Sequence, residues 1–326
     1  MEELYSQFPY DDAFRTMEGE CDDILIHYVN FCHGTDYDSS AQIIRGRNEH
    51  FMEGDGHSDS KRVTDSMFTI VADGKKRKFH HECESGRYDG EVLIRMFEYD
   101  TQIALDTRSI RDNELIVEFP IGCVLMLRNE GEPPEEMFIT IKTLGGEVSY
   151  PVRVIRLSEL DMERIFAKRL YFLIPFYIFN LESEFGQIEN EEEKLGRFGE
   201  FYSHVFERLQ TEELEGRLSA FSKSVIIRIT HKVAYNLTRN KENIQGKVDE
   251  IMGGQIIELD VIKARHEGLA EGEACGEEKG IRVFIEDKVE DGISIEIIQQ
   301  KLEKRFGLDP EKAKEYLKKY ADIKTA

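Results

Sequence analysis

The sequence predicts an α/β fold, in which a mixed sheet flanked by helices is followed by an α-helical C-terminal region. Three observations support this prediction. Up to residue 182 the chain alternates in the order helix, strands, helix, strands. The dipeptide Asp73-Gly74 is a strong hairpin turn signal between two strand-like segments. Beyond residue 182 the apolar residues recur mainly at helical spacing.

Helices are expected on both sides of the first strands. Over residues 10–33 apolar side chains recur at three- and four-residue steps, and Gly34 ends the pattern. Residues 91–107 have a wide apolar face, and an apolar helix is expected over about 158–182. Residues 41–60 are expected to form a weak strand followed by a polar loop. The other strand-like segments, in chain order, are residues 64–72, 78–84, 114–119, 123–128, 137–143 and 148–155.

We divide the chain into four parts by composition. Residues 1–182 form the sheet-containing domain, and residues 183–265 form a helical region that begins with an acidic segment, 182–193. In residues 266–280 glycine recurs at every fourth position, which indicates a linker or a loose, oligomerising helix. Residues 281–326 form two short helices, the second beginning at Asp309-Pro310.

Charge and cysteine content limit the function classes. The net charge of −22 is opposite to that of a protein that only coats nucleic acid, so any DNA contact needs a local basic patch or a bridging metal ion. The five cysteines form no CxxC pair, as expected for free thiols in a reducing cytoplasm. The most apolar segment, 170–179, is shorter than the ~20 residues of a membrane span. We therefore expect a soluble, cytoplasmic protein.

The hairpin around Asp73-Gly74 carries a candidate metal site. Asp65 opens its first strand, and Glu82 and Glu84 lie on one face of the return strand together with His80, because side chains alternate along a strand. Converging carboxylates are the ligands that Mg²⁺ prefers. The alternative is that these are ordinary strand acids paired with Lys or Arg, and that His80 is packed or hydrogen-bonded.

The segment from Arg62 to Leu105 resembles the PD-(D/E)XK nuclease family transposases, which are related to the recombination-promoting nucleases. The matching features are an Asp before one strand, a Glu-x-Glu on the next where the family has Glu-x-Gln or Glu-x-Lys, and a helix with Ile-Arg-Met-x-Glu-Tyr-Asp. Weaker similarity continues on both sides. It includes Asp12-Ala13-Phe14-Arg15, Leu173-Ile174-Pro175-Phe176-Tyr177 and the Glu-Gly repeat near 266–280.

This resemblance implies a restriction-endonuclease-like core in residues 1–182 and a metal-dependent endodeoxyribonuclease of low sequence specificity. It links the protein to transposition or recombination, with DNA as its partner. It also implies that Asp65 and Glu82 bind Mg²⁺, for which Mn²⁺ is a substitute, and that the Cys83 backbone carbonyl is a further ligand. The rival hypothesis is a nuclease-fold protein that has lost catalysis and acts as a binding or assembly module.

Glu84 departs from the family pattern, because an ionised glutamate cannot stabilise charge on a phosphate as lysine does. It is either a metal ligand in the catalytic set or a degenerate position. Arg87 and Arg95 are candidates to replace the missing cation, although Arg95 also has helix neighbours with which to pair. The acid supplied by the opening helix is either Glu18 or Glu20.

Two further features remain open. The segment 222–241 is predicted to be a helix with a basic face, which fits either the DNA backbone or the chain's own acidic segment 182–193; its members are Arg228, Lys232 and Arg239. The C-terminal helices are candidates for homo-oligomer formation. A polar loop contains four residues that could coordinate a cation but fit a solvated loop better: Glu53, Asp55, His57 and Asp59.

Overall fold

The computed structural model describes residues 9–38, 40–45, 49–52, 60–63, 66–253, 281, 284–285, 288–289, 293–306 and 310–320. Contacts divide the chain into two compact units, Met1–Ile256 and Ile257–Ala326. The helices that follow residue 182 share the first unit with the sheet, so the change of composition at that point lies inside a unit. The glycine repeat at 266–280 lies outside the described residues.

The main sheet is mixed and has six strands in the order β1-β4-β5-β8-β10-β9. Strand β5 runs parallel to β8, and β8 runs parallel to β10, whereas the other neighbours are antiparallel. The prediction of an α/β fold with a mixed sheet is confirmed. The strand bounds are Gln42–Arg45 (β1), Ser66–Ala72 (β4), Lys75–Glu84 (β5), Ile121–Met126 (β8), Glu136–Thr143 (β9) and Gly146–Arg156 (β10).

Two small hairpins lie outside this sheet. One pairs β2 (Glu49–Met52) with β3 (Ser60–Val63), and the other pairs β6 (Ser109–Arg111) with β7 (Glu114–Ile116). The strand expected over 114–119 therefore begins correctly but pairs with β6 rather than with the main sheet. Asp112 and Asn113 adopt positive φ angles and form the tight turn of this hairpin.

The N-terminal helical pattern forms two helices, α1 (Pro9–Glu20) and α2 (Asp22–His33), where we expected one. Cys21 leaves the helical region, and Asp22 and Asp23 then occupy the first turn of α2, where acidic side chains favour a helix N-terminus. Gly34 ends α2 in the left-handed conformation, with φ of 62°, as predicted.

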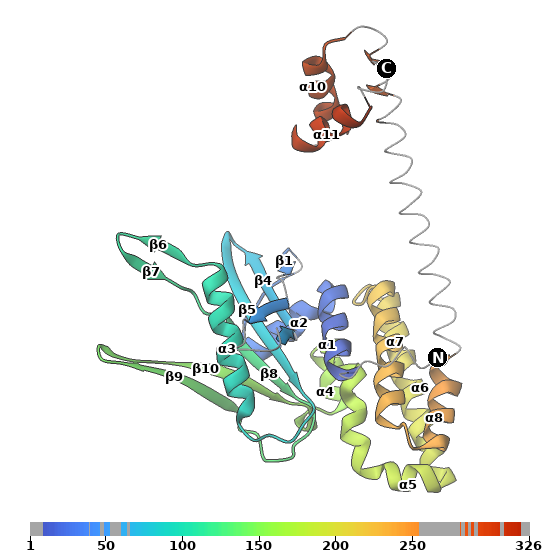
Figure 1. Cartoon of the computed structure of the whole chain (residues 1–326). Helices are drawn as coiled ribbons and strands as arrows, with labels where there is room; N and C mark the ends of the chain where they lie inside the picture. The colour runs from blue at the N-terminus through green and yellow to red at the C-terminus, as the bar shows by residue number, and fades with distance from the viewer. Residues whose placement is uncertain are drawn as a thin grey trace. The chain divides into compact units, whose positions relative to one another are not determined.

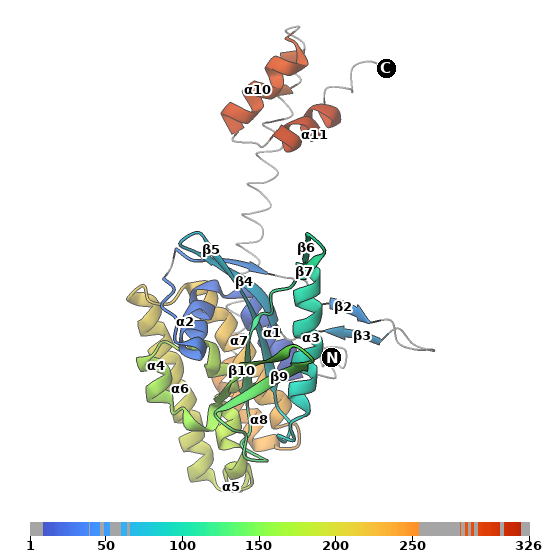
Figure 2. The same ribbon diagram turned by 90° about the vertical axis from the view of Figure 1, so that its left-hand side faces the viewer.

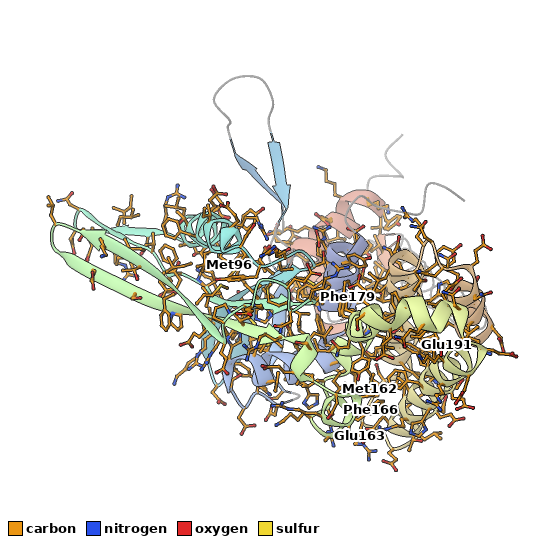
Figure 3. All side chains as sticks on the ribbon, turned by 90° about the horizontal axis from the view of Figure 1, so that it is seen from below. Met96, Met162, Glu163, Phe166, Phe179 and Glu191 are labelled. Carbon is orange, nitrogen blue, oxygen red and sulfur yellow. The ribbon has the colours of Figure 1, made fainter. Side chains whose placement is uncertain are left out.

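Helix α3 (Glu91–Asp106) crosses from β5 to β8 and lies along one face of the sheet (Figure 1). Figure 2 shows α2 on the other side of the strands. Met96 packs between α3 and the strands (Figure 3), where Gly122 of β8 leaves room for it. A Cβ atom at Gly122 would lie 2.8 Å from the Met96 methyl carbon, so this glycine lets the helix approach closely.

The apolar segment after the sheet is not the single helix that we expected over 158–182. It forms a short 3₁₀ turn (η2, Leu157–Glu159), helix α4 (Met162–Ala167) and a 3₁₀ helix (η3, Tyr171–Glu184). Arg169 interrupts the segment with a φ of 55°. Pro175 lies inside η3 and has no N–H for an α-helical hydrogen bond.

Four helices complete the first unit: α5 (Phe185–Asn190), α6 (Glu192–Leu214), α7 (Ala220–Leu237) and α8 (Glu242–Val248), followed by a π-helical turn, η4 (Asp249–Gly253). Helix α7 packs against both α1 and η3. None of the described helices combines the length and apolar character needed to cross a membrane. The second unit contains α10 (Ile295–Phe306) and α11 (Pro310–Tyr320) around a small apolar core, and α11 begins at Pro310 as predicted.

Candidate active site

The predicted carboxylates lie at the C-terminal end of β5. Glu82 and Glu84 are its last residues on the face toward α3. Asp65 lies outside the described residues, directly before Ser66, the first residue of β4, which pairs with His81. The loop candidates Glu53, Asp55, His57 and Asp59 also lie outside the described residues.

Glu82 is held by a buried chain of polar groups. His80 Nε2 lies 3.0 Å from Glu82 Oε1, and His80 Nδ1 lies 2.7 Å from Asp100 Oδ1 on α3. The Tyr150 hydroxyl completes the chain at 3.4 Å from Asp100 Oδ2. The side chains of His80 and Asp100 are fully buried and Glu82 is 5% exposed. The period-two pattern on β5 therefore does place His80 beside Glu82.

The charge on His80 follows from these contacts. Burial opposes protonation, but hydrogen bonds to Asp100 and Glu82 outweigh it and raise the pKa of His80 to about 9. His80 is then an imidazolium near neutral pH, and both ring nitrogens donate. Because the imidazolium is fixed by Asp100, it holds the Glu82 carboxylate in one orientation.

Glu84 and Arg95 form an ion pair between β5 and α3. The second Glu84 oxygen accepts the Gly86 backbone N–H at 2.9 Å. Arg95 thus reaches the strand carboxylates, in addition to any helix neighbour that it contacts. Arg87 is exposed in the loop between β5 and α3. The Cys83 thiol is buried on the opposite face of β5, which leaves only its backbone for the predicted role.

The acid that α1 brings to this site is Asp11, which sequence reasoning missed. The pKa of Asp11 is raised to about 6, first by burial and then by the charges of Glu82 and Glu84, against the opposing effect of Arg15. Asp11 lies in the first turn of α1, and α1 packs against β5. The sequence signal for Asp11 was the acidic pair Asp11-Asp12. The segment that resembles the family begins at Asp12, so Asp11 was not considered.

The two acids that we expected from α1 lie elsewhere, so both alternatives were wrong. Glu18 is 2% exposed and faces Arg45 of β1, with Glu18 Oε1 3.6 Å from Arg45 Nε. Glu20 forms an ion pair with Arg228 at 2.8 Å. The reason is the direction of α1: its first turn approaches the end of β5, and each later turn moves about 5 Å further along the axis.

The basic face of α7 is partly used within the chain. Arg228 pairs with Glu20 of α1, which is neither of the two partners that we considered for this face, DNA and the acidic segment 182–193. Lys232 is half-buried further along the helix. Arg239 is exposed beyond its end. Burial raises the pKa of Tyr10, next to Asp11, and the charges of Arg128 and Arg239 oppose this rise. Glu189 of the acidic segment instead accepts the backbone N–H groups of α8.

A cleft of about 730 Å³ is lined by Arg128 but by none of the carboxylates Asp11, Glu82 and Glu84. Arg128 links the two, because it donates to the carbonyl of Ser85 beside Glu84 and also lines the cleft. Its guanidinium binds Glu182 through two hydrogen bonds of 2.6 and 2.7 Å and lies 4.8 Å from the ring centre of Phe179. Phe179, labelled in Figure 3, also meets Tyr10 edge to face.

The donor set fits Mg²⁺ in kind, because Asp11, Glu82 and Glu84 all offer oxygen ligands. The described carboxylates do not by themselves form a closed site. Within the described part of the chain, three ligand atoms of His, Cys, Asp or Glu come within 4.8 Å of one another only at His33, His81 and Cys123. That group lies on the opposite face of β5. A closed oxygen site would therefore need a ligand from Asp65, or a change in the positions of the Asp11, Glu82 and Glu84 side chains.

Comparison with protein-family models, with curated proteins and with solved structures finds no match to this chain. The assignment of a function thus depends on the residues themselves.

Proposed function

We propose that the chain is a Mg²⁺-dependent endodeoxyribonuclease of the PD-(D/E)XK type, acting in transposition or recombination. The observation that carries this proposal is the pair of carboxylates at the end of β5, where Glu82 is held by His80 and Glu84 by Arg95. Asp65 precedes β4, and α3 packs behind both strands, which is the order of elements in the family motif.

Each residue has a distinct proposed role. Asp65 and Glu82 hold the metal, with the Cys83 carbonyl as a further ligand, and Asp11 adds a third carboxylate from α1. The bound ion would supply an activated water and neutralise charge that develops on the phosphate. His80 and Asp100 keep the Glu82 carboxylate in position through their hydrogen bonds.

Glu84 acquires a role through Arg95. In the family a lysine at this position stabilises charge on the phosphate, and here Glu84 anchors an arginine instead. The Arg95 side chain is 41% exposed, so its guanidinium can reach a phosphate without leaving its partner. Glu84 is then a positioning residue and Arg95 supplies the positive charge.

DNA would approach along the positive groups around the carboxylates. The charges of Arg128 and Arg239 both act on Tyr10 at the start of α1, and Arg128 also binds the Ser85 carbonyl beside Glu84. A protein with a net charge of −22 needs such local cations to bind a phosphate backbone. We propose a cytoplasmic location, which agrees with the free thiols of the four described cysteines.

One observation favours the rival function, a binding or assembly module without catalysis. Glu82 and Glu84 already have partners within the chain, namely His80 and Arg95, so a metal is not needed to offset their charge. In this case the proposed partner surface is the helical part of the chain, including a homo-oligomer formed through α10 and α11.

A cleavage assay on supercoiled and single-stranded DNA with Mg²⁺ or Mn²⁺ separates the two functions. The parent protein should nick DNA, and EDTA, Asp65→Ala and Glu82→Ala should each abolish nicking. Glu147→Ala, on the exposed hairpin of β9 and β10, is the matched control and should leave the rate unchanged. If the folded parent neither cuts DNA nor binds Mg²⁺ or Mn²⁺ in calorimetry, the enzyme proposal fails and the rival stands.

A further inference from the structure

A second group of metal-ligating side chains lies on the face of β5 away from Glu82. His81 on β5 pairs directly with Cys123 on β8 in the parallel register, so both side chains lie on the same face of the sheet. His33, the last residue of α2, lies over them, with its Nε2 2.9 Å from His81 Nε2. One ligand atom from each of the three residues falls within 4.8 Å of the others.

The hydrogen bonding of this group is incomplete. His81 is 1% exposed, and its Nδ1 has no hydrogen-bond partner in the described structure. A neutral imidazole has one donor and one acceptor nitrogen, so the contact with His33 can satisfy only one of them. Buried polar atoms without partners are uncommon in folded proteins and call for an explanation, of which an ion is one.

The ligand types differ from those of the carboxylate site. Two imidazole nitrogens and a thiolate are ligands of Zn²⁺ and similar transition metals, whereas Mg²⁺ prefers oxygen. Cys123 is fully buried, while His33 is partly exposed and offers a route of entry. Cys32, also on α2, has its thiol beside that of Cys123 and is the nearest source of a fourth ligand.

We propose that His33, His81 and Cys123 bind one Zn²⁺-class cation that fastens α2 to strands β5 and β8. The three ligands come from three separate elements, so a bound ion would hold them together in the way a structural zinc does. Binding requires the Cys123 thiol to release its proton to solvent, since the thiolate is the ligand. A second thiolate from Cys32 would give the site zero net charge, which suits its burial.

Burial and then the charge of Arg153 on β10 lower the pKa of His33, so Arg153 is a cation that would also repel a metal ion bound there. Arg153 is already paired with Glu136 at 3.1 Å, which reduces its repulsion of a metal ion. The ligands also need to shift, because two nitrogens bound to one tetrahedral Zn²⁺ lie about 3.3 Å apart. The His33 and His81 Nε2 atoms, now 2.9 Å apart, would exchange their hydrogen bond for bonds to the metal. His33 can supply this movement, since it is the terminal residue of its helix.

The test is metal binding by the full-length, untagged chain. Co²⁺ is the spectroscopic probe, because a thiolate ligand gives a charge-transfer band that a carboxylate site does not. We expect one equivalent of Co²⁺ to produce this band and one equivalent of Zn²⁺ to remove it. We also expect Zn²⁺ to raise the melting temperature.

Three variants give the comparison. His33→Gln, at a partly exposed position, and Cys123→Ala should each weaken Zn²⁺ binding by more than about 10-fold. Removing a residue that only hydrogen-bonds to a metal ligand already costs about 10-fold in affinity, and these two variants remove ligands themselves. His204→Gln, at an exposed position on α6, should bind as the parent does. Circular dichroism establishes that each variant is folded. The proposal is overturned if the folded parent shows no thiolate band with Co²⁺, or if His33→Gln binds Zn²⁺ as tightly as the parent.

Discussion

The Arg95 guanidinium on α3 donates to the Glu84 carboxylate at the end of β5, so one side chain brings a positive charge next to the two strand glutamates. The position at which the nuclease family of the proposed function has Gln or Lys thus carries a glutamate that is paired with an arginine. Whether this pair takes part in catalysis is open to direct measurement.

Arg95→Ala should lower the rate of DNA cleavage by about 100-fold, the effect of removing one group that stabilises transition-state charge. Arg108→Ala, at an exposed arginine beyond α3, is the control and should cut DNA normally. Adding Glu84→Lys to Arg95→Ala should restore part of the rate, because the lysine returns a cation to the same place. If Arg95→Ala cuts at the parent rate, Arg95 serves only as a partner for Glu84.

Asp100→Asn should destabilise the fold by about 3 kcal/mol, because it leaves the buried His80 without one of its two charge partners. Tyr150→Phe removes only the 3.4 Å contact with Asp100 and should cost about 1 kcal/mol. Urea unfolding near neutral pH measures both values. Equal effects of the two variants would contradict the proposed charge on His80.

Glu18→Gln should stabilise the protein above neutral pH. Burial, opposed by Arg45 and reinforced by Asp22, raises the pKa of Glu18 to about 7. The folded state therefore favours the protonated form of Glu18. Its contribution to stability is fully present below about pH 4.5, the pKa in the unfolded state, and is lost as pH rises through about 7, the pKa in the folded state.

The size of this effect follows from the shift in the pKa of Glu18. At pH 8 we expect Glu18→Gln to add up to about 3 kcal/mol, and at pH 4 to add little. The control is Glu20→Gln on the same helix, which removes a surface ion pair with Arg228 and should change stability by less than about 1 kcal/mol. A Glu18→Gln variant with the parent's pH profile would show that Glu18 is not responsible.

Gly131→Ala and Gly74→Ala should differ clearly although both glycines have positive φ. At Gly74, in the turn between β4 and β5, nothing lies within 4 Å of an added Cβ, so the cost is backbone strain of about 1 kcal/mol. At Gly131 the Cβ would lie 2.2 Å from the Tyr88 carbonyl oxygen. We expect the second variant to lose more free energy of unfolding, and equal losses would mean that the loop around Gly131 moves freely.

Much of the sheet could be predicted because the signals are local. Asp73 and Gly74 adopt the positive φ angles of a tight hairpin, and the two strands beside them pair as expected. The helix at 91–107 was predicted within one residue, since its apolar face is complete in one segment. The prediction missed the break at Cys21 because apolar residues recur at helical spacing on both sides of it. A single non-helical residue does not change that spacing.

The candidate site was only partly predictable because its parts are far apart in the sequence. The placement of His80 and Glu82 on one face follows from strand alternation alone. Asp11 and Asp100 join them only through the packing of α1 and α3, which no local pattern specifies. The same is true of the pairing between His81 and Cys123, which depends on the parallel register of two strands separated by a whole helix.

The packing of α1 against α7 has a consequence for the order of assembly on the ribosome. Residues near 11 and residues near 230 are neighbours in the fold, yet about 200 positions of synthesis separate them. At 5–20 residues per second, α1 is exposed for roughly 10 seconds or longer before α7 emerges. A nascent chain that stops before α7 therefore leaves one face of α1 uncovered, and Glu20 lacks its partner Arg228 until α7 has been made.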